Sequence, residues 1–206
     1  MPGTTRCGRY RPAKTWIQQN LAPIVTMLRC CRVFEELYLA VGSDALAPCN
    51  VGQFGARLAP CLREVHSALK AGLADRVKLV TLLGMSIVKD TYPPSAGVVS
   101  ETRLAVVTDV GRLLIEICSP FCANVYSFLA GSYSLLFKLN RSFVDGDSLT
   151  YTDMVSPWYD SVVTTLLKLD VFRADIMEVV VTDTGWPTAA SNMVDFVKGR
   201  RFTAGA

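Results

Sequence analysis

The chain has 206 residues, of which 50% are hydrophobic and 19% are charged, with a formal net charge of +3. This composition suits one globular domain with a sizeable core, and the charge excess is too small and too scattered to indicate nucleic-acid binding. No apolar run reaches the roughly 18 residues that would predict a membrane span, and the first residues do not resemble a secretory signal.

The amino-terminal third is predicted to hold a tail, a helix and a strand. Residues 1–12 are basic and rich in turn formers, and we expect them to form a tail. From Ala13 onward, Trp16, Ile17 and Leu21 recur at near-helical spacing, which predicts a helix that Pro23 ends. The apolar run at 37–42 predicts a short strand.

Helices and strands alternate along the rest of the chain. The pattern predicts helices over 53–71, 101–118 and 151–169, strands over 77–83 and 121–126, an irregular loop over 84–97 and a loop-rich stretch over 128–148 with a turn at 145–147. Such alternation is typical of parallel βαβ units, and the sequence therefore predicts an α/β fold.

The stretch that follows carries the clearest strand and the clearest site signal. Residues 179–181 are three valines, which predicts a strand buried on both faces of a parallel sheet. Polar residues 182–184 follow, with Asp183 in the middle, and then come Trp186 and Pro187. A carboxylate beside an aromatic plate at the end of a buried strand is typical of sugar sites in α/β barrels. The alternative is a polar strand end with an aspartate cap and a core tryptophan.

Two other predicted strands also end in polar residues. Ser43 and Asp44 follow the strand at 37–42, whereas Asn124 and Tyr126 lie two residues apart at the end of the strand at 121–126 and so share one side of the sheet. Because parallel strands end at a common edge, these residues and Asp183 are expected at one rim. The alternative for Asn124 and Tyr126 is that they are hydrogen-bonded inside a barrel rim.

Several tracts resemble glycoside hydrolase family 17, the plant-type 1,3-β-glucanases. The sequence EVVVTDTGWPT at 178–188 is similar to the signature of that family, in which hydrophobic residues precede Thr or Ser, Glu, Thr or Ser, and Gly-Trp-Pro. The tracts YPPSAG at 92–97, PFCANVY at 120–126 and YTDM at 151–154 also resemble the family, although Ser127 stands where proline is expected.

The resemblance implies a fold and a site. It implies a partial (β/α)8 TIM barrel over 13–190, covering about strands four to seven, with the first three and the last strand absent and a truncated tail at 191–206. Open edges of this kind predict poor solubility or partial order at both ends. The resemblance also implies retaining, endo-acting hydrolysis of 1,3-β-glucan without a cofactor. Asp183 takes the nucleophile position, Asp44 takes the proton-donor position, and the substrate-binding positions are Ser43, Asn124, Tyr126 and Trp186.

The chain departs from the family at the chemical centre. Both catalytic glutamates are replaced by aspartates, and Ser43 stands where the family has an asparagine. Retaining glycosidases need two carboxyl groups about 5 to 5.5 Å apart, and a misplacement of about 1 Å can cost on the order of 100-fold in rate. We therefore expect weakened activity. The alternative is a catalytically inactive or truncated relative that binds glucan; an inverting geometry is less favoured.

The cysteines carry little functional signal. There are seven of them at irregular spacing, and His66 is the single histidine. We expect buried free thiols and no metal site rather than a redox or metal protein. Relatives in the family are typically secreted or lie in the cell wall, whereas the sequence leaves localisation and oligomeric state open.

Overall fold

The computed structural model describes residues 13–31, 37–71, 77–126, 143–146, 149–153, 155–169, 172 and 177–185. Four strands form one parallel sheet in the order β1-β2-β3-β6, namely β1 (Leu37–Ser43), β2 (Val77–Gly84), β3 (Phe121–Val125) and β6 (Val179–Thr184). A helix lies in each connection: α3 (Val51–Lys70), α4 (Leu104–Glu116) and α6 (Ser156–Leu167). The predicted α/β alternation is confirmed.

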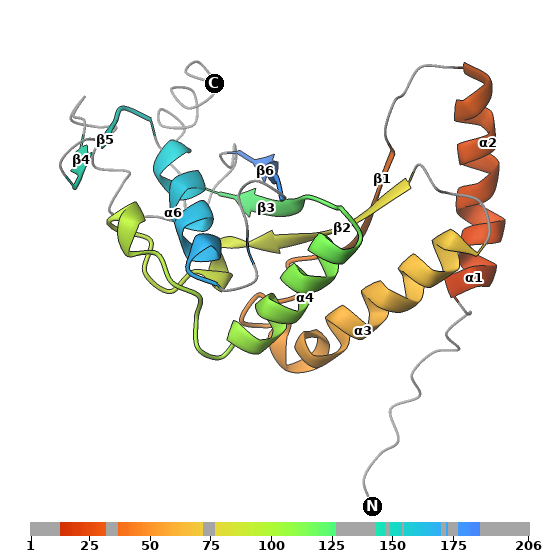
Figure 1. The fold of residues 1–206 in the computed structure, drawn as a ribbon, viewed down its shortest axis with the longest axis horizontal. Coiled ribbons are helices and arrows are strands. Elements are labelled where there is room, and N and C mark those ends of the chain that lie inside the picture. The colour runs from red at the N-terminus through yellow and green to blue at the C-terminus, as the bar shows by residue number, and fades with distance from the viewer. Residues whose placement is uncertain are drawn as a thin grey trace, which may run out of the picture.

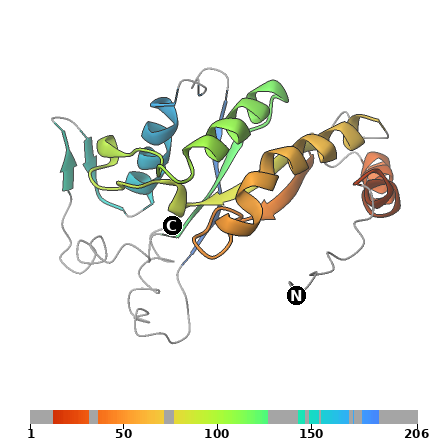
Figure 2. The ribbon, with the colours of Figure 1, turned by 90° about the horizontal axis from the view of Figure 1, so that it is seen from below.

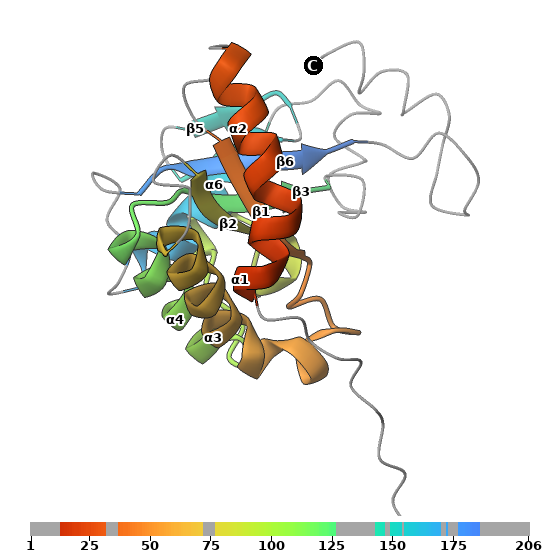
Figure 3. The ribbon, with the colours of Figure 1, turned by 90° about the vertical axis from the view of Figure 1, so that its right-hand side faces the viewer.

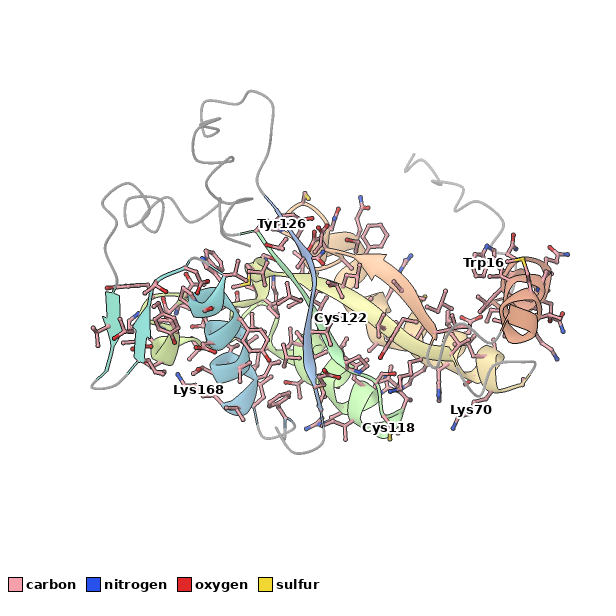
Figure 4. All side chains as sticks on the ribbon, turned by 90° about the horizontal axis from the view of Figure 1, so that it is seen from above. Trp16, Lys70, Cys118, Cys122, Tyr126 and Lys168 are labelled. Carbon is pink, nitrogen blue, oxygen red and sulfur yellow. The ribbon has the colours of Figure 1, made fainter. Side chains whose placement is uncertain are left out.

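The register of the strands brings their carboxyl ends to one edge of the sheet. Asn124 on β3 pairs with Gly84 on β2 and with Asp183 on β6, whereas Ser43 on β1 pairs with Leu82. Figure 4 shows Cys118 and Tyr126 at opposite ends of β3, with Tyr126 at the carboxyl end. This edge is the rim that the sequence predicts.

One hydrophobic core joins the sheet to its helices. In Figures 1 and 2, α3 and α4 lie across one face of the sheet, and α6 lies beside them near β3. Because strand side chains alternate between faces, Leu79 and Leu83 of β2 point to the helices. The fully buried side chains of this core include Leu62, Leu69, Leu79, Leu83, Val107, Leu113, Leu114, Phe121 and Leu166.

The amino-terminal helix does not end at Pro23, and that prediction is wrong. The helix runs as α1 (Ala13–Trp16), a π-helical turn η1 (Ile17–Leu21) and α2 (Ala22–Cys31). The Ala22 N–H donates to the Ile17 carbonyl, five residues back, so the turn before Pro23 is widened. Pro23 then lies at the start of α2, where a missing N–H is tolerated. Figure 3 shows α1 and α2 in front of the sheet when it is viewed from the end that carries β1.

The segment after β3 differs from the prediction in two ways. The predicted loop at 128–148 contains β4 (Phe143–Asp145), which pairs antiparallel with β5 (Leu149–Tyr151). The predicted helix at 151–169 begins at Ser156, because Asp153 accepts hydrogen bonds from the N–H groups of Val155 and Ser156 at 2.7 Å each. These bonds satisfy amide groups that a helix start leaves without partners.

Strand β6 is less buried than its three valines predict. Val179, Val180 and Val181 are only half-buried. Among the described residues β6 pairs with β3 alone and is the last strand in the sheet order. A strand at this position has a neighbour on one side only, so the prediction of burial on both faces is wrong here. The predicted tails at 1–12 and 191–206 lie outside the described residues.

Hydrogen bonds and close packing attach the loop after β2 to the β4–β5 hairpin and to α6. It contains two 3₁₀ helices, η2 (Met85–Ile87) and η3 (Pro94–Ala96), where an irregular loop is predicted. The N–H and the hydroxyl of Ser95 both donate to the buried Asp145 carboxylate at 2.7 Å, and Lys168 Nζ donates to the Ser95 carbonyl at 2.8 Å. Gly97 packs so closely that a Cβ there would lie 2.7 Å from both the Ser161 carbonyl oxygen and Thr165 Oγ1.

Gly97→Ala is expected to destabilise the protein by about 1 to 3 kcal/mol, because a new methyl group would overlap backbone on α6 that cannot rotate away. Urea unfolding measures the loss. Gly52→Ala is the matched control, since a Cβ at Gly52 meets nothing within 4 Å. Equal unfolding midpoints for the two variants would contradict this close packing.

Asp153→Ala is expected to cost about 0.5 to 2 kcal/mol of stability through loss of the helix cap. Burial opposes ionisation of Asp153, but hydrogen bonds from Ser156 and Val155 outweigh it and lower its pKa. A lowered pKa in the folded state means that the charged cap stabilises above the unfolded pKa of about 3.9 and that this contribution is lost as pH falls.

Asp153→Asn is the control for this titration, because the amide oxygen still accepts the bonds but does not ionise. Thermal unfolding of the wild type and of Asp153→Asn should therefore differ more at pH 7 than at pH 3. A difference that stays constant with pH would show that the Asp153 charge plays no part.

Candidate functional site

The end of β1 is turned sharply, and this turn presents Asp44. Gly42 and Asp44 both have positive φ, at 80° and 49°, and the β1–β2 register shifts between Ala40 and Ser43. Aspartate is one of the few residues with a side chain that adopt the left-handed region readily. The Asp44 N–H donates to the Leu82 carbonyl at 2.9 Å, and Asn50 Nδ2 donates to the Asp44 carbonyl at 3.1 Å. The backbone of Asp44 is thus held on both sides.

The segment after Asp44 is anchored by a buried arginine. Arg103 Nε donates to the Leu46 carbonyl at 2.7 Å, and Ser86 Oγ donates to the same oxygen at 3.3 Å. Arg103 is 9% exposed and Leu46 is 1% exposed. A charged donor in such a site makes a strong hydrogen bond. Arg103 therefore fixes the loop that carries Asp44 to the start of α4.

A row of polar side chains crosses the sheet edge. Asn124 Nδ2 donates to Ser43 Oγ at 3.4 Å, and Thr182 Oγ1 donates to Asn124 Oδ1 at 3.0 Å. The row joins β1, β3 and β6 and passes β2 at Gly84, which has no side chain to interrupt it. Asn124 is 1% exposed, and both ends of its amide bond to protein. The alternative of an asparagine hydrogen-bonded inside the rim describes this residue well.

The predicted carboxylates lie on the same side of this edge. The Tyr126 hydroxyl donates to Asp183 Oδ2. This hydrogen bond, together with burial and the negative charges of Asp183 and Asp44, raises the pKa of Tyr126 to about 12. The Asp183 carboxylate is therefore in direct contact with the phenol. Asp183 is exposed, whereas Asp44 and Tyr126 are half-buried.

The structure places the predicted site residues in different surroundings. Ser43 and Asn124 belong to the polar row, Tyr126 and Asp183 are joined by a hydrogen bond, and the Asp44 carboxyl group lies beside Gly84 of β2. Trp186 lies outside the described residues. The sequence reasoning gave no site role to Thr182 or Gly84, although Thr182 is part of the polar run after the three valines, which was a usable signal. Nothing in the sequence pointed to Gly84.

The four cysteines whose side chains the structure describes show no arrangement that suggests a metal centre. Cys49, Cys61, Cys118 and Cys122 are free, but Cys49 and Cys118 are exposed, so the prediction of buried thiols is wrong for these two. Burial, with a contribution from the charge of Glu178, raises the pKa of the Cys122 thiol to about 11. Within the described ranges no group of three His, Cys, Asp or Glu side chains could hold a metal ion, and no described helix is long and apolar enough to cross a membrane.

The fold and the site together define an α/β protein with two aspartates at the carboxyl ends of its parallel strands, where such folds place ligands. The sequence model of Glycosyl hydrolases family 17 matches residues 8–198, and the chain belongs to this family. The predicted resemblance is confirmed.

Relatives and solved structures agree with this membership. The chain is 31% identical over 204 residues to glucan endo-1,3-beta-glucosidase GII of Hordeum vulgare, covering 94% of this chain and 55% of the relative. It is 31% identical over 188 residues to glucan endo-1,3-beta-glucosidase 11 of Arabidopsis thaliana, covering 85% of this chain and 41% of the relative. The chain thus spans about half the length of these relatives.

The structural comparison extends over nearly the whole chain. CJP38, a beta-1,3-glucanase and allergen of Cryptomeria japonica pollen, superposes with a TM-score of 0.77 at 23% identity, covering 94% of this chain and 60% of that one. A structure described as one of two plant beta-glucan endohydrolases with distinct substrate specificities gives a TM-score of 0.73 at 23% identity, covering 93% of this chain and 60% of that one. At this identity the likeness shows the shared fold.

Tyr126 is expected to ionise well above the usual tyrosine range. Spectrophotometric titration of the wild type and of Tyr126→Phe should differ by one phenol that ionises near pH 12, and Asp183→Asn should bring that phenol down because the accepting charge is gone. Since the folded pKa exceeds the unfolded value of about 10, the contact stabilises the fold below that pH and is lost as pH rises further. A Tyr126 that titrates near 10 in the wild type would show that the contact with Asp183 does not form.

Proposed function

We propose that the protein hydrolyses 1,3-β-glucan internally with retention of configuration, and that its activity is weakened by two short carboxylates. Asp183 serves as nucleophile and Asp44 as general acid and base. The proposal is supported by family membership, by relatives named as glucan endo-1,3-beta-glucosidases, and by a four-stranded parallel sheet with Asp44 and Asp183 at the carboxyl ends of its outer strands. The observation that carries it is the hydrogen bond from Tyr126 to Asp183 at the edge of the sheet where Asp44 follows β1.

In the proposed reaction Asp183 attacks the anomeric carbon while Asp44 protonates the leaving glycosidic oxygen. Water then cleaves the glycosyl ester on Asp183, with Asp44 as base. Tyr126 holds Oδ2 of Asp183, which leaves Oδ1 to attack and fixes the plane of the carboxylate. A fixed plane favours a productive approach to the sugar.

The substrate-binding residues have different parts in this proposal. Tyr126 and Trp186 offer ring faces on which a sugar can stack. Ser43 contacts the sugar in place of the asparagine of the family. Because both ends of the Asn124 amide are taken by Ser43 and Thr182, Asn124 acts by orienting the Ser43 hydroxyl. The proposed partner is thus a neutral polysaccharide.

A second candidate is a glucan-binding relative without catalysis. The Asp44 side chain favours it, because Oδ1 is buried and has no hydrogen-bond partner among the described residues. A carboxylate turned into the protein is poorly placed to protonate a leaving group. This candidate predicts glucan binding that survives loss of either aspartate.

The test measures reducing-sugar release from a linear 1,3-β-glucan by the full chain and by Asp44→Glu/Asp183→Glu. We expect slow hydrolysis by the wild type and a rise on the order of 100-fold in the double variant, because each added methylene restores about 1 Å of reach. Asp183→Asn is the inactive control.

A wild-type rate that the double variant does not improve would contradict the account of the short side chains. If neither protein releases sugar but both bind glucan in a pull-down assay, the second candidate holds instead.

A further inference from the structure

The Asp44 carboxyl group occupies the space that a side chain at Gly84 would fill. A Cβ at Gly84 would lie 3.2 Å from Asp44 Cγ and closer still to Oδ1, and the three nearest atoms to it all belong to Asp44. Oδ1 is the same oxygen that is buried without a hydrogen-bond partner in the described part of the chain. The carboxyl group is therefore folded back over β2.

The backbone of Gly84 does not require glycine. Its φ of −80° and ψ of 170° are extended values that any residue adopts. Its missing side chain has two visible consequences, namely the uninterrupted polar row between β1 and β3 and the recess that Asp44 enters. What glycine supplies here is thus space rather than flexibility.

The backbone of Asp44 cannot follow a displaced carboxyl group. Its N–H bonds to the Leu82 carbonyl, its carbonyl accepts from Asn50, and the next turn is tied to Arg103 through Leu46. A side chain at position 84 would therefore act on Asp44 by rotating its side chain, which is the one soft element left.

We propose that Gly84 is a positioning residue that lets the Asp44 carboxyl group retreat against β2, and that a methyl group at this position would advance it into the space over the strand ends. The advance needed to reach van der Waals contact is about 1 Å, similar to the reach that aspartate lacks relative to glutamate. The catalytic part of this inference rests on the proposed function, whereas the steric part does not.

The steric part is tested by a double-mutant cycle in urea with Gly84→Ala, Asp44→Gly and both together. Glycine at position 44 removes the carboxyl group and suits the φ of 49° there. We expect Gly84→Ala to shift the unfolding midpoint in the wild type by an amount that disappears in Asp44→Gly, because neighbours in contact are not additive. The same shift in both backgrounds would overturn the inference.

The catalytic part is tested on linear 1,3-β-glucan with the full chain. We expect Gly84→Ala to raise kcat on the order of tenfold with KM little changed, since only the placement of the proton donor alters. The gain should vanish in Asp44→Asn, which has no proton to give. Gly52→Ala, whose new methyl group meets nothing within 4 Å, should leave kcat unchanged.

The outcomes separate the two proposals. A gain that persists in Asp44→Asn, or an unchanged kcat in an active protein, overturns the role of Gly84. If no variant hydrolyses glucan, the proposed function fails, and the double-mutant cycle alone decides whether Gly84 positions Asp44.

Discussion

The hydrogen bond from the Asp44 N–H to the Leu82 carbonyl is the constraint on which the site depends. It holds β1 against β2 at the point where β1 stops being regular, and it does so with Asp44 in a left-handed conformation. Once this residue is fixed, Ser43 faces the amide of Asn124, and the following turn reaches the guanidinium of Arg103. A shift of one residue in the pairing of β1 would turn the side chains of β1, Ser43 included, to the other face of the sheet and away from Asn124.

The polar groups at the edge of the sheet differ in burial and in what they contact. The row of Ser43, Asn124 and Thr182 ties strands together, and its central amide is almost fully buried. Tyr126 and Asp183 lie further out, and Asp183 is exposed. Groups that are buried and saturated rigidify a site, whereas exposed charged groups can exchange partners. Asn124 thus links strands within the sheet, whereas Tyr126, two residues further on and just past the end of β3, contacts Asp183.

Much of the fold was predictable, because side-chain periodicity and strand-end polarity are local signals. They gave the alternation of helices and strands and the rim that joins Asp44, Asn124 and Asp183. The wrong predictions arose where contacts beyond the local sequence pattern decide the structure. A widened turn carries the first helix past Pro23, a carboxylate three residues earlier in the chain delays α6 to Ser156, and β6 is half-buried because it stands last in the sheet order. The recess at Gly84 depends on cross-strand register and one backbone angle, neither of which composition encodes.

The two hydrogen bonds between Ser95 and Asp145 have a consequence for how a ligand approaches. Two short bonds to one buried carboxylate, together with the tight seat of Gly97 on α6, join the loop after β2 to a helix that follows β3. Swinging that loop outward would have to break both attachments at once. This loop is therefore already ordered in the folded protein, so a ligand that contacts it does not have to order it on binding.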